Sequence, residues 1–202
     1  MTLRSALLAL LSSGPMTGYD VGKQFSTSVG HVWHAPDSQI YPELRKMEAE
    51  GLLKGERIPW GNRGATKTEY TLTLAGEAAL REWQAQPLSY VRDRNPARLK
   101  AAYFEWAPPG AAAIQLRAHA AHYQEQKVQA IQMIDELESR TNSTLARRLA
   151  RFPGTDHERI VRFKIFAYQG TVAHAEQEIE WAERGLRLLD ELGDLQQPDD
   201  NR

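Results

Sequence analysis

Residues 37–51 read DSQIYPELRKMEAEG, and this stretch decides the fold of the N-terminal half. At about 100° per residue, Ile40, Leu44 and Met47 share one apolar side of a helix, so that side is expected to face a core. Gly51 is suited to end the helix, because glycine adopts left-handed backbone angles without strain. The opposite side carries Ser38, Tyr41, Pro42, Arg45 and Ala49. Pro42 is expected within about one turn of the helix start, since deeper inside it would remove a hydrogen bond.

The composition is that of an ordinary globular chain. With 202 residues, 42% of them apolar and 25% charged, the chain can bury one large core or two smaller ones. Cysteine is absent, which excludes disulfides and thiolate metal sites and fits a cytoplasmic protein. The apolar run at residues 6–11 is too short for a membrane span, and no later stretch is long enough, so no membrane partner is expected. Because the net charge is only −1, any affinity for DNA must come from the local placement of charge.

The order of elements in the first half predicts a winged helix-turn-helix domain over residues 1–88. Periodic leucines predict a first helix, and Thr17 is placed to cap a second one. After the helix described above, residues 54–60 and 67–73 are expected to pair as a two-stranded β-hairpin around a turn rich in glycine. Thr73 is then placed to cap a fourth helix.

Three motifs follow one another in this half at fixed spacing. They are Gly18-Tyr19, Ile40-Tyr41-Pro42-x-Leu44-x-x-Met47-Glu48-x-x-Gly51-Leu52, and Tyr70-x-Leu72-Thr73-x-x-Gly76 after the hairpin. Over roughly residues 3–84 the chain therefore resembles the PadR family of transcriptional regulators, and the resemblance implies a DNA-binding protein. The chain departs from the family in the hairpin, or wing. Members often carry several basic residues before the tyrosine, whereas this chain has Arg63 and Lys67 with an intervening Glu69.

The residues after position 88 are expected to form an α-helical domain that joins two copies of the chain. Asn95-Pro96 predicts the start of a short helix, and two helices of about thirty residues follow, separated near Pro153-Gly154. Each long helix would measure about 45 Å, more than a compact domain of this size needs, so its apolar area predicts a second chain. One of them carries a modestly apolar stripe of Ile114, Ala118, Ala121, Val128, Ile131 and Leu137.

The arrangement of the long helices resembles the long-tailed PadR members, which have a helical, Vir-activator-like C-terminal domain that clasps a symmetry mate. The resemblance implies a homodimer. The predicted fold class is therefore mainly α, with a winged helix-turn-helix over residues 1–88, a two-stranded wing, and a long-helix dimerisation domain over residues 89–202.

The recognition helix is expected to enter a major groove with its opening residues near the base edges. Gln39 is suited to adenine, Arg45 to guanine or a phosphate, and the Tyr41 hydroxyl to a phosphate. Arg63, at the wing tip, is suited to the adjacent minor groove. The candidate DNA contacts are Lys23, Ser38, Gln39, Tyr41, Pro42, Arg45, Lys46, Lys54, Arg63 and Lys67. The alternative is a dimeric adaptor that uses the winged helix to dock another protein.

The second half also carries aromatic and titratable side chains that suit a flat lipophilic or phenolic effector. These candidates are Tyr103, Trp106, His119, Tyr123, Tyr168, His174 and Trp181. Residues of the same kinds serve the core of a helical interface equally well. The resemblance to PadR-like proteins, which often respond to phenolic or drug-like molecules, is the main reason to expect an effector.

No metal, cofactor or catalytic site is expected. His119 and His122 would share one side of a helix with Glu125 a turn further on, but zinc needs three or four converging ligands, and solvated or hydrogen-bonded histidines explain the pattern as well. The sequence has no glycine-rich phosphate loop, nucleophile elbow or HExxH motif. It predicts a homodimeric repressor that binds an inverted-repeat operator, and not an enzyme.

Overall fold

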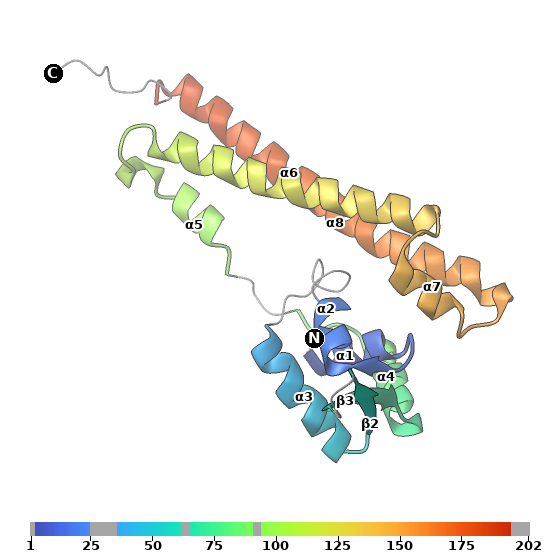
Figure 1. The fold of residues 1–202 in the computed structure, drawn as a ribbon. Coiled ribbons are helices and arrows are strands. Elements are labelled where there is room, and N and C mark those ends of the chain that lie inside the picture. Colours follow the sequence, from blue (N-terminus) through green and yellow to red (C-terminus); the bar gives the residue numbers. More distant parts are fainter. Residues whose placement is uncertain (1–2, 25–35, 62–64, 91–93, 195–202) are drawn as a thin grey trace. The chain divides into compact units, whose positions relative to one another are not determined.

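The computed structural model describes residues 3–24, 36–61, 65–90 and 94–194. The chain divides into unit 1, made of residues 1–89 and 136–163, and unit 2, made of residues 90–135 and 164–202. Two long helices, α6 (Ala111–Glu138) and α8 (Gly154–Glu191), contribute residues to both units (Figure 1). The predicted fold class, mainly α with a small winged helix-turn-helix sheet, is confirmed.

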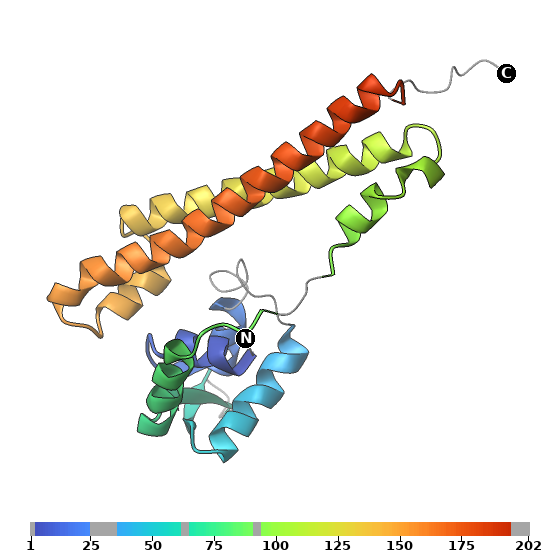
Figure 2. The ribbon, with the colours of Figure 1, turned by 180° about the vertical axis from the view of Figure 1, so that it is seen from behind.

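Unit 1 is built around a small antiparallel sheet (Figures 1 and 2). Within residues 3–85 its helices are α1 (Leu3–Leu11), α2 (Gly18–Gln24), α3 (Asp37–Ala49) and α4 (Leu74–Ala85), and its strands are β1 (Met16–Thr17), β2 (Leu53–Trp60) and β3 (Ala65–Leu72). The strand order is β1-β3-β2. The core around the sheet includes the fully buried side chains of Leu7, Leu11, Met16, Val21, Ile40, Leu44 and Met47.

The wing hairpin pairs as predicted, but the sheet has three strands and not two. The β2–β3 register runs from Leu53 opposite Leu72 to Trp60 opposite Ala65. The additional strand is β1, in which Met16 pairs with Tyr70. Met16 is 1% exposed, so pairing with β3 satisfies its backbone while its side chain enters the core.

The helix starts predicted from capping residues are confirmed. The backbone N–H of Asp20 donates to Thr17 Oγ1 at 3.2 Å, and that of Gly76 donates to Thr73 Oγ1 at 3.1 Å. In α5 (Pro96–Ala101), the N–H of Arg98 donates to Asn95 Oδ1 at 2.9 Å. Each cap satisfies a donor that the first turn of a helix leaves without a backbone partner.

The prediction that Pro42 lies within about one turn of the helix start is wrong. The helix α3 begins at Asp37, so Pro42 is its sixth residue. Proline has no N–H to donate to the carbonyl of Ser38, four residues earlier. Because Ser38 is exposed, water can satisfy that carbonyl, and the helix continues.

Residues 136–163 belong to unit 1 by their contacts, although the sequence analysis groups everything after residue 88 into one helical domain. They include α7 (Ser143–Leu149), whose Leu145 is fully buried. From α7, the Thr144 hydroxyl donates to Gln24 Oε1 at 3.3 Å. The assignment of DNA binding to residues 1–88 and of dimerisation to residues 89–202 stays a prediction.

Unit 2 consists of α5, a short 3-10 helix η2 (Phe104–Trp106), and parts of α6 and α8. The two long helices run side by side in both ribbon views (Figure 2). Their contact is made of small residues and leucines: Ala112, Ala113, Leu116, Ala182 and Leu189. An added Cβ at Gly185 would lie 2.9 Å from Leu116 Cδ1, so glycine at that position allows the helices to approach closely.

The apolar stripe of α6 lies mostly on the outer surface of the single chain. Ile114 is 67% exposed and Val128 54%, and further along the chain Phe166 of α8 is 72% exposed. Leu137, also counted in the predicted stripe, is instead buried in unit 1. None of the helices in the described part of the chain is long and apolar enough to cross a membrane.

Candidate nucleic-acid interface

The helix α3 has one buried and one exposed side, as its spacing predicts. Ile40, Leu44 and Met47 are at most 1% exposed. All the predicted DNA-contacting residues of this helix are exposed: Ser38, Gln39, Tyr41, Pro42, Arg45 and Lys46. The buried side fixes the helix in unit 1, so the exposed side is presented as a rigid surface.

Two tyrosines flank a close contact between α2 and α3. The ring of Tyr41 lies against Gly18, where an added Cβ would come within 2.7 Å of Tyr41 Cε1. Tyr19, next in the chain, is 69% exposed. Burial raises the pKa of Tyr41, and the nearby Asp37 and Tyr19 raise it further, so its hydroxyl remains a neutral donor at physiological pH. Tyr19 belongs to the family motif but is not among the predicted DNA contacts. Its exposure and its place beside Tyr41 make it a further candidate.

Arg4 of α1 organises the acidic residues of α3, and sequence reasoning missed it. Its Nε donates to Glu43 Oε1 at 2.8 Å, and its Nη2 donates to Glu50 Oε1 at 3.1 Å. The hydrogen bond from Arg4 is the main cause of the lowered pKa of Glu50. One guanidinium therefore ties a carboxylate of α3 and the carboxylate just after its end to α1, and it partly neutralises charges that would repel a phosphate backbone.

The predicted DNA-contacting lysines of the wing and of α2 differ in exposure and in their partners. Lys54 is exposed and forms an ion pair with Glu56, which raises the pKa of Lys54. Lys67 is half-buried in β3, opposite Ile58. Lys23 is exposed on α2. Arg63, the predicted minor-groove residue, lies outside the described residues.

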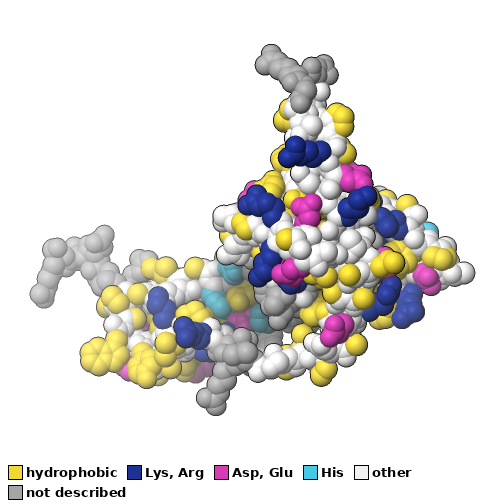
Figure 3. Space-filling view, turned by 90° about the horizontal axis from the view of Figure 1, so that it is seen from below, with side chains coloured by type: hydrophobic (Ala, Val, Ile, Leu, Met, Phe, Trp, Pro, Cys, Tyr) yellow, Lys and Arg dark blue, Asp and Glu magenta, His cyan; other side chains and the backbone are white. Residues whose placement is uncertain are grey.

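Charge is mixed on the surface that Figure 3 displays. Lysine and arginine side chains alternate there with aspartate and glutamate and do not merge into one basic patch. This agrees with the net charge of −1 for the whole chain. Contacts with a polyanion therefore depend on individual side chains such as Arg45 and Lys46 more than on a long-range field.

Four of the predicted effector residues come together in unit 2. The ring of His119 lies 4.8 Å from that of Tyr123 and 5.1 Å from that of Trp181, measured between centroids. Tyr123 in turn lies 5.6 Å from His174. These rings join α6 to α8, as aromatic contacts in a helical core do.

A buried carboxylate, which the sequence analysis did not predict, contacts one member of this aromatic cluster. Glu178 is 4% exposed, and it accepts hydrogen bonds from Arg98 and from His119 Nε2, the latter at 2.9 Å. Burial alone would raise the pKa of Glu178, but these hydrogen bonds outweigh it and hold the pKa below its ordinary value. The guanidinium of Arg98 also lies 4.3 Å from the centre of the Trp181 ring. Because Arg98 and His119 already engage Glu178, the network suits fastening α5 to α6 and α8.

The other three predicted effector residues lie apart from the carboxylate. Tyr103, just before η2, is 58% exposed, and Trp106, the last residue of η2, is 84% exposed. Tyr168 is buried on α8, ten residues before Glu178, which is about 15 Å along a helix axis. Among the described residues, no group of three or more histidines and carboxylates is arranged to hold a metal ion.

Comparison with known proteins agrees with this geometry. The family model of the transcriptional regulator PadR-like family matches residues 7–82. The negative transcriptional regulator PadR of Bacillus subtilis is 40% identical over 81 residues, which cover 40% of this chain. The match spans 44% of the length of that relative.

Solved structures extend the likeness to the long helices. Bacillus subtilis PadR in complex with operator DNA superposes with a TM-score of 0.72 at 22% identity, over 92% of this chain and 97% of that chain. The Vibrio cholerae virulence activator AphA superposes with a TM-score of 0.67 at 24% identity, over 95% of this chain and 99% of that chain. At these identities the superpositions show the fold alone. Residues 7–82 thus match the PadR-like family of transcriptional regulators, and the chain as a whole, long C-terminal helices included, has the fold of PadR and AphA.

Proposed function

We propose that this chain is a sequence-specific DNA-binding regulator of transcription that acts as a homodimer, represses by occupying an inverted-repeat operator, and responds to a small effector. The observation that carries the proposal is the two-sided α3. Three buried residues hold the helix, while Tyr41, Arg45 and Lys46 stand exposed on its outer side. A helix that presents polar and cationic side chains in this way suits a major groove.

In this proposal the exposed residues divide their roles by chemistry. The planar guanidinium of Arg45 can pair with guanine or with a phosphate. The hydroxyls of Tyr41 and Tyr19 suit phosphate oxygens, to which a hydroxyl can donate a hydrogen bond. Arg4 supports these contacts indirectly, since it holds Glu43 and Glu50 in ion pairs.

The second element of the proposal is the homodimer. Exposed apolar side chains recur at helical spacing along α6, at Ile114, Val128 and Ile131. A second copy of the same stripe would remove this area from water, and a two-fold axis would relate the two winged helices. A two-fold axis predicts an operator made of inverted half-sites about one helical turn, or ~34 Å, apart.

The proposal also includes repression and an effector. Repression is proposed because the matched Bacillus subtilis relative is described as a negative regulator. An effector would act only if it bound one state of the dimer more tightly than the other. The predicted lipophilic or phenolic effector would use the aromatic cluster of His119, Tyr123, His174 and Trp181 in unit 2.

A gel-shift comparison of single variants tests the DNA-binding element. Duplexes selected from genomic fragments would be titrated with the wild-type protein, with Arg45→Ala, and with Arg187→Ala as a matched control. Arg187 is an exposed arginine of α8 in unit 2. Arg45→Ala should lose most of the affinity while remaining a dimer, whereas Arg187→Ala should bind normally. Equal retention by both variants would exclude Arg45 as a DNA contact.

The alternative is a dimeric adaptor that docks another protein on the winged helix. Salt separates the two functions. For a protein that makes six to ten phosphate contacts, raising the salt from about 50 to 200 mM lowers the DNA affinity by roughly 10³- to 10⁵-fold. The reason is that binding releases counterions from the DNA, and this release is less favourable at high salt. An adaptor would retain no DNA at any salt concentration.

A further inference from the structure

A half-buried carboxylate, that of Glu48 near the end of α3, lies between this helix and the wing. An added Cβ at Gly55 of β2 would lie 2.9 Å from Glu48 Cδ and 3.1 Å from Thr68 Cγ2. Gly55 pairs with Tyr70 of β3, whose side chain is buried in the core of unit 1. Paired residues point to the same side of a sheet, so the carboxylate lies against the side of the wing that faces this core.

The neighbour of Glu48 on α3 is Arg45, the candidate base-reading residue. The two residues are three positions apart in the helix, so their side chains lie next to each other on its surface. Both charges also act on Tyr70. Burial raises the pKa of the Tyr70 hydroxyl, the negative charge of Glu48 raises it further, and the positive charge of Arg45 lowers it. Arg45 therefore has a carboxylate beside it at the junction of α3 and the wing.

The negative charge of Glu48 is not compensated as the neighbouring ones are. Glu43 and Glu50 both form ion pairs with Arg4. Within the described ranges of the chain, Glu48 forms no ion pair with a lysine, arginine or histidine. The exposed side of α3 thus keeps one acidic group where a phosphate backbone would be expected to approach.

Such a charge discriminates between the two partners that suit Arg45. A phosphate is an anion, so a carboxylate beside the arginine repels it. The edge of guanine presents neutral acceptors, O6 and N7, and is repelled much less. Binding to random DNA depends on phosphates, whereas a specific complex also reads base edges. The carboxylate therefore weakens the random complex more than the specific one.

We propose that Glu48 is a specificity-determining residue, whose carboxylate, seated against Gly55, disfavours contacts between Arg45 and phosphates and leaves the arginine for a base edge of the operator. This inference deepens the proposed function and rests on it, because it needs a protein that binds DNA through α3.

Anisotropy titrations of the full chain with two duplexes test the role of Glu48. One duplex is the operator that the wild type selects from a random pool, and the other has the same length and composition in scrambled order. The variants are Glu48→Gln, Gly55→Ala and the double variant. Gly55→Ala moves the carboxylate without removing its charge, and the move is cheap because the carboxylate is the end of a flexible side chain. Thermal melting shows whether each variant is folded.

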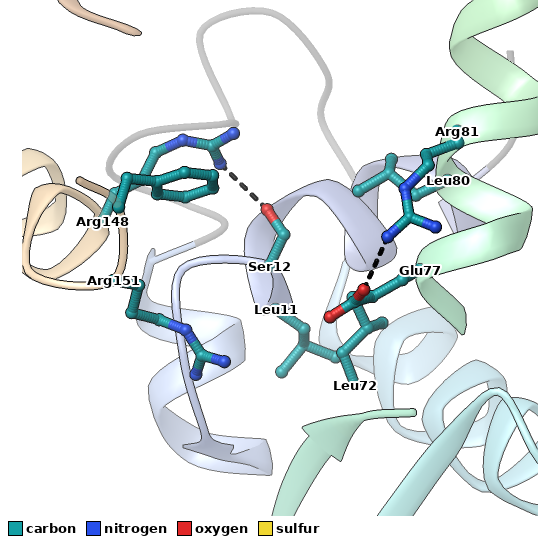
Figure 4. A pocket seen from close by; sticks show the side chains of 9 residues that line it. Leu11, Ser12, Leu72, Glu77, Leu80, Arg81, Arg148 and Arg151 are labelled. Atoms are coloured by element: carbon teal, nitrogen blue, oxygen red, sulfur yellow. Dashed lines mark hydrogen bonds and ion pairs between the residues drawn. The ribbon is translucent and has the colours of Figure 1, made fainter. Parts of the chain in front are cut away.

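The matched control is Glu77→Gln, because Glu77 is also a half-buried glutamate of unit 1. It lies in α4, which the sheet separates from α3 in both ribbon views (Figures 1 and 2). Its carboxylate pairs with Arg81 at 2.8 Å on the wall of a pocket (Figure 4). The control changes the net charge as Glu48→Gln does, so it measures the effect of net charge alone.

We expect Glu48→Gln to bind the scrambled duplex roughly threefold to tenfold more tightly, because a repulsion near the surface is removed. Its affinity for the operator should change less, so the ratio of the two affinities should fall. The affinity for the scrambled duplex should also depend more steeply on salt, by about one unit of log–log slope for each new phosphate contact. Gly55→Ala should lower the ratio too, and it should have little further effect in the double variant, since both changes act through one carboxylate. A residue that only stabilises the fold would change the melting temperature and leave the ratio unchanged.

The proposal is overturned if the ratio stays at its wild-type value or rises in Glu48→Gln, if Glu77→Gln lowers it as much, or if Gly55→Ala has its full effect in the double variant. If Gly55→Ala unfolds, Glu48→Gln decides the result, because the amide keeps the shape of the carboxylate. Retention of DNA by the wild type with an unchanged ratio in Glu48→Gln rejects the role of Glu48 alone. A wild type that retains neither duplex rejects the regulator itself, and the role of Glu48 with it.

Discussion

Replacing Gly76 by alanine should destabilise the winged helix-turn-helix, although alanine favours helices more than glycine does. Gly76 is buried in the first turn of α4, where its N–H donates to the capping hydroxyl of Thr73. An added Cβ would lie 2.2 Å from the carbonyl oxygen of Leu52 and 2.8 Å from Leu72 Cδ1. Real Cβ atoms essentially never approach another heavy atom closer than 3.0 Å, so α4 or the turn before β2 must move.

That movement would break more than a packing contact. The backbone N–H of Thr73 donates to the Leu52 carbonyl at 3.2 Å, and the Thr73 hydroxyl donates to the Gly51 carbonyl at 2.7 Å. Overpacking costs about 1–3 kcal/mol. One weakened hydrogen bond costs about 1 kcal/mol, and the higher helix propensity of alanine returns up to about 1 kcal/mol. The net loss is therefore about 1–3 kcal/mol, or roughly 2–12 °C in Tm for a chain of this size.

Thermal and urea unfolding of Gly76→Ala and Gly154→Ala measure this effect against a matched control. Gly154 begins α8, also within unit 1, and an added Cβ there meets nothing within 4 Å. The free energy of unfolding of the control, Gly154→Ala, should stay within about 0.5 kcal/mol of the wild-type value. Equal stability of the two variants would refute the claim that the close approach of Leu52 requires glycine at position 76.

Three further predictions follow from the ion pairs and rings. Arg4→Ala should weaken DNA binding on the order of tenfold at low salt and less at high salt, because it leaves Glu43 and Glu50 without their arginine. Anisotropy titrations at two salt concentrations measure this, and an unchanged affinity contradicts it. The lowered pKa of Glu178 means that its stabilising contribution is present above its ordinary value of 4.5 and is lost as the pH falls through the lowered value. Glu178→Gln should therefore cost about 1–3 kcal/mol at pH 7 and flatten the loss of stability in acid, whereas melting curves that keep the wild-type pH dependence would show that another group causes it. If the aromatic cluster of unit 2 binds a phenolic effector, such a ligand should quench the fluorescence of Trp181 saturably in a titration, and Trp181→Phe should abolish that component.

Local patterns predicted much of unit 1 because they have local physical causes. The periodicity of 3.6 residues identified the buried side of α3, and the hydroxyl of Thr73 identified the start of α4. The same reasoning missed β1, because a strand of two residues shows no periodicity. It also misplaced the start of α3 relative to Pro42, since an exposed carbonyl four residues earlier allows a proline inside the helix.

The contacts that sequence reasoning missed join residues far apart in the chain. Arg98 and Glu178 are separated by 80 positions, and Ser12 and Arg148 by 136. Neither pair belongs to a motif, so no spacing indicates it. Four of the predicted effector residues lie together because their rings are at helical spacing on α6 and α8, whereas the buried Glu178 that His119 contacts was missed. That these rings bind an effector stays a prediction.

The central claim is that the exposed side of α3 contacts DNA. Selection of duplexes from a random-sequence pool tests this claim most directly. The wild-type protein should enrich an inverted repeat with half-sites about one helical turn apart, and its affinity should fall steeply as salt rises. The Arg45→Ala variant, folded and dimeric, should enrich nothing. A wild-type selection without enrichment at low salt, or the same sequence enriched equally by Arg45→Ala, would contradict the account.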